Sequence, residues 1–472
     1  MKVLLIQPAG NCEKLSSTLA NHSEPLGLCY VAAYAKQQGN DVQIIHQITE
    51  SDDKIIRMVE EYRPDLVGFS TMTYNFNNAI AIADMIKQTT PAKIVFGGVH
   101  VTADIESIKH RSIDYIVRGE GDHTFSELIY AIENFASEAQ LRKIKGIVFN
   151  DKSEIINTGM PDRITALDSL SFPLREGLLV GEAKYVRHGL VYPAVSKQRR
   201  ASINASRGCL HKCSFCTSPM QWSYSQEYRS AKNVVDEIEL LIDKYQINYF
   251  ELRDENFTQN RTRAIKICDE INTRGIKISW YCQGRISDII KGNFVDTKLL
   301  ENLKAAGCFE IEYGIESGLD KSLERMQKGI TIQQTQKVVK VTQEAGLVVH
   351  ALMILGFPWE IKQDLVDSVC FARELEVDKY RFAFFVPFKG SASYEAINKE
   401  QIKDKNINNW TTDTPVVSLK DMNLSELHSF RNYAYTAVYT TSFYERCKNK
   451  AAIPKLKETY EDWMNFIRTL VV

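Results

Sequence analysis

Three closely spaced cysteines lie in the stretch Ser206-Arg-Gly-Cys-Leu-His-Lys-Cys-Ser-Phe-Cys-Thr217, which follows a short strand-like run. Cys209, Cys213 and Cys216 form a C-x3-C-x2-C triplet. Cysteine thiolates hold iron–sulfur clusters, and a cluster of four irons usually takes four of them. A triplet with no fourth cysteine nearby leaves one iron without a protein ligand, so that this iron can bind a substrate or cofactor. The spacing predicts a 4Fe-4S cluster that takes part in chemistry.

Two other interpretations also fit three close cysteines. Zinc sites prefer four ligands, often in C-x2-C spacings, and His211 lies inside the loop as a candidate fourth ligand. Free cysteine is among the most buried residue types, so the three could also be ordinary core thiols. The rest of the chain favours the cluster.

The triplet and its flanks resemble the radical S-adenosylmethionine (SAM) superfamily. The resemblance implies a cluster ligated by Cys209, Cys213 and Cys216, whose open iron binds the amino and carboxylate groups of SAM. It also implies that one-electron reduction cleaves SAM to methionine and a 5′-deoxyadenosyl radical that abstracts hydrogen. Phe215 matches the aromatic residue usual between the last two cysteines and is expected to shield the cluster. The protein's part is orientation, shielding and redox tuning.

Composition places the chain among globular proteins of more than one domain. A chain of 472 residues is too long for a single ordinary domain core. Its apolar content of 44% and charged content of 25% are typical of soluble proteins. The net charge of −1 argues against general nucleic-acid binding. No apolar run is long enough for a transmembrane segment, and the N-terminus lacks a signal peptide's apolar region. Ten cysteines, three of them in one loop, do not suggest a disulfide framework, which predicts a reducing cytoplasmic location.

The first 135 residues alternate between strand-like and helix-like runs. Short β-branched runs separated by helical patterns predict a Rossmann-like α/β domain over residues 1–135, with a parallel sheet between two layers of helices. Residues 136–198 are expected to form an irregular connector with a hairpin that includes Gly146-Ile-Val-Phe149. The predicted strands are Val3–Gln7, Val42–His46, Leu66–Ser70, Ile94–Gly97 and Tyr115–Val117, and the predicted helices are Leu26–Gln38, Asp52–Tyr62, Asn77–Lys87 and Thr124–Ile132.

Three loops at the carboxyl ends of these strands contain the small residues of ligand-binding loops. Parallel sheets bind ligands at this edge, and paired glycines allow close backbone approach. None of the loops has the G-x-G-x-x-G fingerprint of a dinucleotide site. The candidate cofactor-binding residues are Ser70 and Thr71 in the first loop, Gly97 and Gly98 in the second, and Glu120 in the third.

These segments together resemble the cobalamin-binding domain of a large radical SAM subfamily. The matching pieces are Glu24-Pro-Leu-Gly-Leu28, Gly97-Gly-Val-His-Val-Thr102 and Val117-Arg-Gly-Glu-Gly121. The resemblance implies cobalamin as a cofactor, although some relatives keep the scaffold without it. The D-x-H-x-x-G motif, whose histidine ligates cobalt, is absent, so cobalamin is expected base-off with no histidine below the cobalt. His100 and His123 are the alternative lower ligands, and both are more typical of loop or packing residues.

A second alternating series begins at Ala201 and predicts a partial (βα)6 barrel over residues 199–395. The cysteine triplet follows its first strand, where barrels gather their active residues. Residues 396–472 are mostly helical in pattern and rich in aromatic residues that form core or line a substrate cavity. The predicted strands are Ala201–Ala205, Tyr249–Leu252, Ile278–Cys282, Phe309–Tyr313, Val348–Leu355 and Phe382–Val386, and the predicted helices are Asn233–Tyr245, Thr262–Arg274, Asp296–Ala306, Ile332–Ala345 and Asp364–Glu374.

Further site residues follow from the radical SAM resemblance. It implies that Glu316, at the end of the fourth barrel strand, accepts the ribose hydroxyls of SAM. Arg285 is expected to pair with the methionine carboxylate through its planar guanidinium. Asp254 or its neighbour Glu255 is expected to bind SAM or to shape the cavity, with a solvated acid as the alternative. Leu355-Gly-Phe-Pro-Trp359 resembles a turn whose backbone groups bind adenine.

The resemblance makes methyl transfer to an unactivated carbon or a phosphinate phosphorus of a small molecule the leading reaction. One SAM would methylate cobalamin, and a second would supply the 5′-deoxyadenosyl radical, after which the substrate radical takes methyl from methylcobalamin. The implied partners are a small-molecule substrate and a low-potential flavodoxin or ferredoxin. The alternatives are ring closure, ring contraction or oxidation of a porphyrin- or lipid-like substrate with the same cofactors, a tRNA methylthiotransferase, and a redox or iron sensor that cleaves no SAM.

Overall fold

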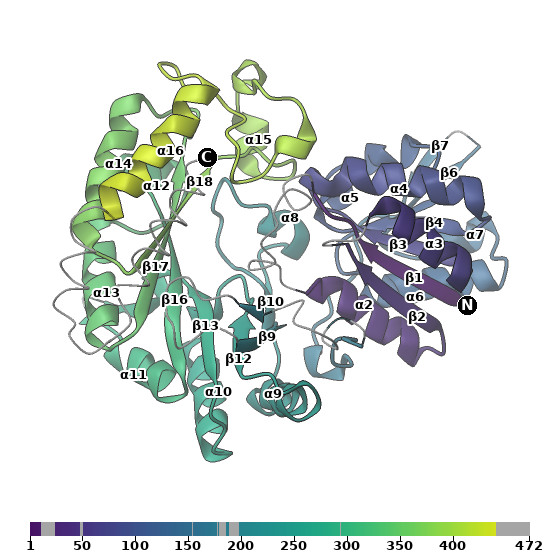
Figure 1. Cartoon of the computed structure of the whole chain (residues 1–472), viewed down its shortest axis with the longest axis horizontal. Coiled ribbons are helices and arrows are strands. Elements are labelled where there is room, and N and C mark those ends of the chain that lie inside the picture. Colours follow the sequence, from purple (N-terminus) through teal and green to yellow (C-terminus); the bar gives the residue numbers. More distant parts are fainter. Residues whose placement is uncertain are drawn as a thin grey trace.

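Two large sheets stand side by side in the computed structural model, with α8 (Ser218–Trp222) and β10 (Ser206–Gly208) between them (Figure 1). The first sheet forms the N-terminal domain and the second forms a partial barrel. Among the described residues, no helix is long and apolar enough to cross a membrane. The structure describes residues 1–10, 24–47, 51–152, 154–176, 178, 186–187, 198–292 and 294–439.

The N-terminal sheet has seven strands in the order β2-β1-β3-β4-β5-β6-β7. Its first five strands are parallel, as the alternating pattern predicts, and β6 and β7 follow as antiparallel neighbours of β5. The hairpin expected in the connector therefore extends this sheet beyond residue 135. The strands are β1 (Lys2–Gln7), β2 (Asp41–His46), β3 (Leu66–Ser70), β4 (Lys93–Gly97), β5 (Tyr115–Val117), β6 (Ile147–Asp151) and β7 (Glu154–Asn157).

Helices cover both faces of this sheet (Figure 1). Leu4 and Leu5 are adjacent in β1, yet they join different apolar cores, because successive residues of a strand point to opposite faces. A strand buried on both faces needs such a continuous apolar run. The helices are α2 (Leu26–Gln37), α3 (Asp52–Tyr62), α4 (Phe76–Thr89), α5 (Val99–Ala103), α6 (Gly121–Glu133) and α7 (Glu138–Leu141), with 3-10 turns η2 (Thr73–Asn75), η3 (Ile105–Lys109) and η4 (Leu167–Ser169).

The second sheet has the order β18-β17-β16-β13-β12-β9-β8. The six strands from β9 to β18 run parallel, which is the expected partial (βα)6 barrel, and β8 pairs antiparallel at its end. The strands are β8 (Val186–Arg187), β9 (Gln198–Ile203), β12 (Tyr249–Leu252), β13 (Ser279–Gly284), β16 (Cys308–Glu316), β17 (Val348–Leu355) and β18 (Lys379–Phe384).

Amphipathic helices cover the outer face of the barrel (Figure 1). In α9, Val234, Ile238 and Leu241 recur at helical spacing and are buried, and the Ser230 side chain caps the helix by accepting the Asn233 N–H. The helices are α9 (Ala231–Tyr245), α10 (Arg261–Thr273), α11 (Thr297–Ala305), α12 (Asp320–Arg325), α13 (Ile332–Glu344) and α14 (Lys362–Leu375). Shorter elements are β11 (Gln226–Tyr228), β14 (Ile290–Lys291), β15 (Phe294–Val295), η6 (Phe257–Gln259) and η7 (Ile286–Ile289).

The chain after the barrel covers one edge of it. Helix α16 (Leu424–Tyr439) lies beside the edge strand β18, where the Tyr435 and Tyr439 hydroxyls accept the backbone N–H groups of Phe382 (3.1 Å) and Tyr380 (2.8 Å). These bonds occupy donors that an open sheet edge would expose. Between the barrel and α16 lie α15 (Ala392–Ala396), η8 (Lys399–Gln401) and η9 (Ile407–Asn409). The remainder of the predicted helical domain, residues 440–472, lies outside the described residues.

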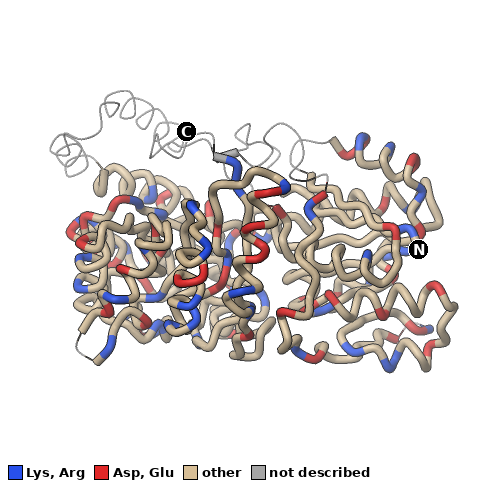
Figure 2. Tube along the Cα trace, turned by 90° about the horizontal axis from the view of Figure 1, so that it is seen from below, with Lys and Arg blue, Asp and Glu red and all other residues tan. Residues whose placement is uncertain are grey.

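Charges of both signs are interspersed along both domains (Figure 2), in keeping with the net charge of −1. The junction of the domains holds buried ion pairs instead. The Glu24 carboxylate accepts the Ser202 N–H (2.7 Å) and lies 3.4 Å from Arg175 Nε. Arg175 also donates to Glu237 of α9 (2.6 Å). These contacts tie the loop before α2 to the first barrel strand.

Candidate functional site

The three cysteines lie on the loop between β10 and α8, at the carboxyl end of β9. Gly208 enters this loop with a φ of +100°, and a Cβ there would lie 2.1 Å from the Ser225 carbonyl oxygen. Only glycine fits this turn. The Ser214 N–H then donates to the Met326 carbonyl (2.9 Å) and fixes the loop against the barrel mouth.

Hydrogen bonds reach the sulfurs of Cys213 and Cys216, and the His211 backbone also bonds to Cys209. Arg285 Nη1 donates to Cys213 Sγ (3.2 Å), and the Ser218 N–H donates to Cys216 Sγ (3.4 Å). Burial raises the pKa of Cys216 to about 11 and also raises that of Cys209, so both thiols stay protonated without a metal. Iron binding has to displace these protons, as in other cysteine-ligated metal sites. The thiol donors and their hydrogen bonds fit an iron–sulfur cluster.

The same loop fits zinc less well. A single ion needs ligand atoms close to one another, and the three sulfurs do not meet that condition. Among the described residues, only Glu310, Glu312 and His350 bring three such atoms within 4.8 Å of each other. Nε2 of His211, the candidate fourth ligand, lies 3.7 Å from Asp288. The wider spacing of the sulfurs favours a larger inorganic cluster.

Glu316 and Arg285 lie at the barrel mouth beside this loop. Glu316 ends β16 with a positive φ of 67°, and its Oε1 accepts a hydrogen bond from Lys328 Nζ (2.6 Å). The same ammonium group lies over the Phe215 ring, 5.8 Å from its centroid. Arg285 Nε donates to Ser287 Oγ (3.0 Å), so the guanidinium is held between this hydroxyl and Cys213. Glu316, Arg285 and Phe215 therefore come together around the cysteines, while Lys328 escaped the sequence analysis because no motif marks it.

The turn after β17 is held by a buried carboxylate. Glu360 accepts the N–H groups of Gly356 (3.2 Å) and Phe357 (3.0 Å) and the Ser322 hydroxyl (3.1 Å). Burial raises the pKa of Glu360 to about 7. The Phe357 ring stacks on Trp359 and meets Phe215 edge-on. This turn is thus a rigid aromatic wall beside the cysteine loop.

The Asp254 side chain is fully buried and bonded within the protein, and its assignment as a cofactor-binding residue stays a prediction. Its carboxylate accepts the Ala205 N–H (2.7 Å), the Ser206 hydroxyl (2.5 Å) and a bond from Arg263 Nη2 (3.0 Å). These bonds position the start of the cysteine loop. The neighbouring Glu255 accepts the Gly208 N–H (3.1 Å) and lines a cavity, and burial raises its pKa.

A cavity of about 520 Å³, here called the large cavity, lies between the two domains. The carboxyl ends of the N-terminal strands form one wall, and β9, β10 and α8 form the other. The predicted residues Ser70, Thr71, Gly97 and Gly98 all line it. Gly98 has a φ of +97°, and a Cβ there would lie 2.5 Å from the Thr71 carbonyl oxygen, so glycine lets the two loops meet. This glycine-lined cradle fits a large cofactor approached by backbone groups.

Buried charges form the wall of the large cavity. Glu120 lines it, yet its carboxylate is occupied by Arg163 Nη1 (2.8 Å), the Ile164 N–H (3.1 Å) and Arg207 Nη1 (3.0 Å). Arg207 also makes two bonds to Asp122 (2.9 and 3.1 Å). Glu120 therefore joins the domains while it lines the large cavity, and its assignment as a cofactor-binding residue stays a prediction. This network escaped the sequence analysis because its members are far apart in the chain.

Neither alternative histidine ligand of cobalt lines the large cavity. His100 packs on Phe76, its Nδ1 lies 3.3 Å from Thr73 Oγ1, and burial lowers its pKa to about 4. The His123 ring contacts the Tyr34 ring in a tilted arrangement, with the centroids 4.7 Å apart. His46, at the end of β2, does line the large cavity, and the sequence analysis did not single it out.

A second cavity of about 490 Å³, here called the small cavity, lies where α4, α5 and η3 face the segment after the barrel. Its lining is mostly apolar and aromatic: Met72, Tyr74, Phe76, Val99, Ala103, Phe388, Ile407 and Trp410. Trp410 belongs to the tail whose aromatics were expected to form core or to line a substrate cavity. Thr217, next to the last cysteine, also lines this cavity.

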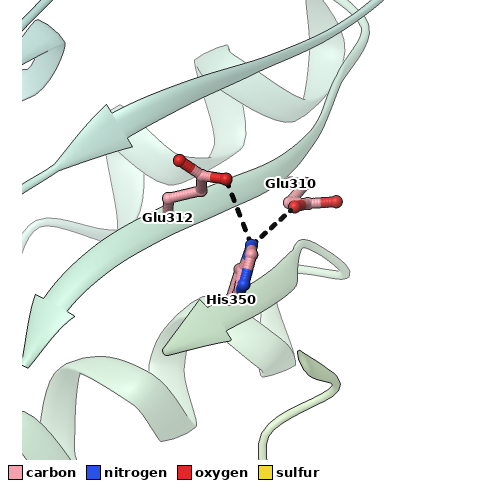
Figure 3. Close-up of side chains that lie close together, drawn as sticks. All are labelled: Glu310, Glu312 and His350. Atoms are coloured by element: carbon pink, nitrogen blue, oxygen red, sulfur yellow. Dashed lines mark ion pairs between the residues drawn. The ribbon is translucent and has the colours of Figure 1, made fainter. Parts of the chain in front are cut away.

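The barrel interior contains a polar cluster of Glu310, Glu312 and His350 (Figure 3). His350 Nδ1 lies 3.3 Å from Glu310 and 3.1 Å from Glu312, and Lys379 Nζ donates to Glu310 (2.5 Å). Burial opposes a charge on the ring, but the two carboxylates raise the pKa of His350. The ammonium of Lys379 offsets the acidic charge that would attract a cation. The cluster is an ion-pair network across β16, β17 and β18, and the sequence analysis did not predict it.

Comparison with known proteins agrees with this arrangement. The B12 binding domain family matches residues 14–129, and the Radical SAM superfamily matches residues 203–372. An uncharacterized methyltransferase of Pyrococcus horikoshii is 30% identical over 93% of this chain and 92% of its own length. An anaerobic magnesium-protoporphyrin IX monomethyl ester cyclase of Rubrivivax gelatinosus is 28% identical over 90% of this chain and 75% of its own length. The solved cobalamin-dependent SAM radical enzyme OxsB with aqua-cobalamin bound shares the fold, with a TM-score of 0.76 at 17% identity over 100% of this chain and 72% of its own.

Proposed function

We propose that this chain, which belongs to the cobalamin-binding radical SAM family, is a methyltransferase that acts on an unactivated carbon or a phosphinate phosphorus of a small molecule. One observation carries the proposal. The glycine-lined strand ends of the N-terminal domain line the large cavity together with β10 and α8, the two elements that flank the cysteine loop. A methyl donor and a radical source can serve one substrate only if both face it. The similarity to a relative named as a methyltransferase supports this reaction.

The cofactors are a 4Fe-4S cluster, SAM and cobalamin, which when bound supply radical chemistry and a methyl group. In our proposal, Cys209, Cys213 and Cys216 hold the cluster, and Phe215 shields it. Glu316 and Arg285 bind SAM. Ser70, Thr71, Gly97 and Gly98 hold cobalamin.

The protein's own contribution is to hold these groups at fixed distances. Arg285 places one positive charge 3.2 Å from Cys213 Sγ. Lys328 orients Glu316 through a buried bond of 2.6 Å. The Arg207 network fixes the strand ends of one domain against the cysteine loop of the other. Such fixed positioning supplies much of the rate of a reaction between bound groups.

A cyclase that retains both cofactors is the second candidate. The 28% identity to the anaerobic magnesium-protoporphyrin cyclase favours it, as does the apolar small cavity, which suits an extended ring. Methyl transfer from SAM to cobalamin separates the two candidates, because ring closure alone does not need it. The electron donor, a low-potential flavodoxin or ferredoxin, and the cytoplasmic location stay predictions.

The test is an anaerobic preparation with reconstituted cluster and added hydroxocobalamin, followed by desalting. We expect near-stoichiometric cobalamin with a base-off spectrum, and transfer of labelled methyl from SAM to the reduced cofactor. A Cys213→Ala variant should lose iron and SAM cleavage yet keep cobalamin. Retention of the cluster without cobalamin would exclude methyl transfer, and cobalamin retention without methylation would favour the cyclase.

A further inference from the structure

We propose that the small cavity is the substrate site, and that it takes the apolar ring system of a molecule whose ring carries one hydroxyl or carbonyl group. The inference rests on the proposed function, because it names the class of substrate for that reaction. It concerns residues of the N-terminal domain and of the segment after the barrel, with Thr217 of the cysteine loop, and it uses none of the residues to which the proposed function gives a cofactor.

The small cavity lies beside both parts of the site. Met72, Tyr74 and Val99 line the small and the large cavity alike, so one wall separates the two spaces. At the other side, Thr217 follows Cys216 directly in the chain. A molecule in the small cavity therefore lies next to the cysteine loop and next to the cobalamin cradle. This position meets the geometric demand of a reaction that uses both.

The lining selects for an apolar ring. Phe76, Phe388 and Trp410 present aromatic surface, and Ile407, Val99 and Ala103 present aliphatic surface. Burying apolar area contributes about 25 cal/mol per Å², and flat rings gain further from contact with aromatic side chains. A sugar or a phosphate ester would regain few of its lost hydrogen bonds to water in this mostly apolar lining.

The His100 ring offers a polar group to a ligand inside the small cavity. His100 Nδ1 is engaged by Thr73 Oγ1 at 3.3 Å, while Nε2 has no polar partner among the described residues. Burial keeps the ring neutral at ordinary pH. A neutral imidazole nitrogen can exchange one hydrogen bond with a hydroxyl or carbonyl. His100 therefore offers a directed polar contact in a mostly apolar lining that also includes Thr73, Ser107 and Thr217.

The charges at the rim are already paired. Lys389 Nζ, in the segment after the barrel, lies 2.6 Å from Asp104 of the N-terminal domain. Glu106 pairs with Lys109. These pairs leave no buried charge in the lining to recognise an ionic group, which favours an uncharged ring over a charged one.

The experiment uses the holoenzyme with cluster and cobalamin, and 2-naphthol and naphthalene as probes. Binding is measured by equilibrium dialysis under anaerobic conditions. Ala103→Phe and Ser107→Phe place a ring in the small cavity, while Ala81→Phe adds the same ring on the exposed face of α4 as a matched control. His100→Leu removes only the polar contact. Cobalamin and iron are quantified in every variant.

We expect one saturable site for both probes. Each filling variant should weaken binding at least about tenfold, and Ala81→Phe should leave it unchanged. His100→Leu should weaken 2-naphthol about fivefold and leave naphthalene unchanged, because only the former offers a hydroxyl. Failure of the probes to bind, or equal binding by the filling variants, would overturn the inference. Loss of cobalamin from both filling variants would assign the small cavity to the corrin periphery and also overturn it. In each of these outcomes, methylation of cobalamin still tests the proposed function separately.

Discussion

The two cavities lie at the same domain junction and share a wall, yet their linings follow opposite principles. The large cavity is walled by buried ions, with Arg207 bonded to Glu120 and Asp122. The small cavity is walled by rings, and His100, its buried titratable group, is held neutral. A wall of fixed charges and backbone groups suits a cofactor rich in amides and phosphate. A wall of rings suits a molecule recognised by shape.

This contrast shows how one interface can hold two kinds of molecule. Buried ion pairs contribute little net stability but fix positions, because breaking one leaves an unpaired charge. Apolar surfaces contribute stability without fixing direction. The ion pairs around the large cavity therefore align the two domains. The apolar lining of the small cavity would, in our proposal, contribute affinity for the substrate.

The largest effect should follow from removing the ion network. Arg207→Met leaves Glu120 and Asp122 without their shared partner in a buried position, and should lower the free energy of unfolding by about 4 kcal/mol. Urea denaturation followed by circular dichroism measures it. Lys36→Met removes an exposed pair with Glu176 and should cost under about 1 kcal/mol. Similar losses in both variants would mean that the network does not hold the junction.

A somewhat smaller effect is expected at the glycine cradle. Gly98→Val forces a Cβ against the Thr71 carbonyl oxygen and shifts the loop that is proposed to hold cobalamin. The free energy of cobalamin binding should fall by about 3 kcal/mol, which corresponds to about a hundredfold weaker binding. Cobalamin retained after desalting is the measurement. Gly159→Ala also occupies a positive φ but meets open space, and should keep cobalamin. Full retention of cobalamin by the Gly98 variant would show that the cofactor does not bind at this loop.

The burial of His100 beside the small cavity should make the free energy of unfolding depend on pH. Because the pKa of His100 is lowered to about 4, the unfolded chain binds an extra proton between pH 4 and 6.5, and the folded protein loses stability as the pH falls through that range. Between pH 7 and pH 5 the loss at this residue should be about 2 kcal/mol. His100→Gln should flatten the profile of the unfolding free energy by that amount. An unchanged profile would show that His100 is solvated.

The smallest effect should come from the rim. The ion pair between Lys389 and Asp104 joins the domains but is partly exposed, so Lys389→Met should change stability by under about 1 kcal/mol. Its effect should vanish in high salt, which thermal denaturation at two salt concentrations measures. A loss of stability as large as that of Arg207→Met would show that this exposed ion pair and the buried Arg207 network contribute equally.

Prediction from sequence succeeded where the signal was local. The helical spacing of Val234, Ile238 and Leu241 and the alternating strands of both domains are local patterns, and the structure places helices and strands over nearly the same residues. It could not separate two adjacent residues that point in different directions. Asp254 and Glu255 are both acids at a strand end, and only the folded backbone assigns the first to the fold and the second to the large cavity.

The sequence by itself determined the cysteine triplet, the alternation of strands and helices, and the glycines at the strand ends, because each depends on neighbours in the chain. The tertiary structure alone decided that Arg207 meets Glu120 and Asp122, that Lys328 meets Glu316, and that Trp410 and Phe76 line the same cavity. Those pairs are set by how two domains and a tail pack together. Packing depends on the shape and charge of whole surfaces, which no stretch of sequence carries.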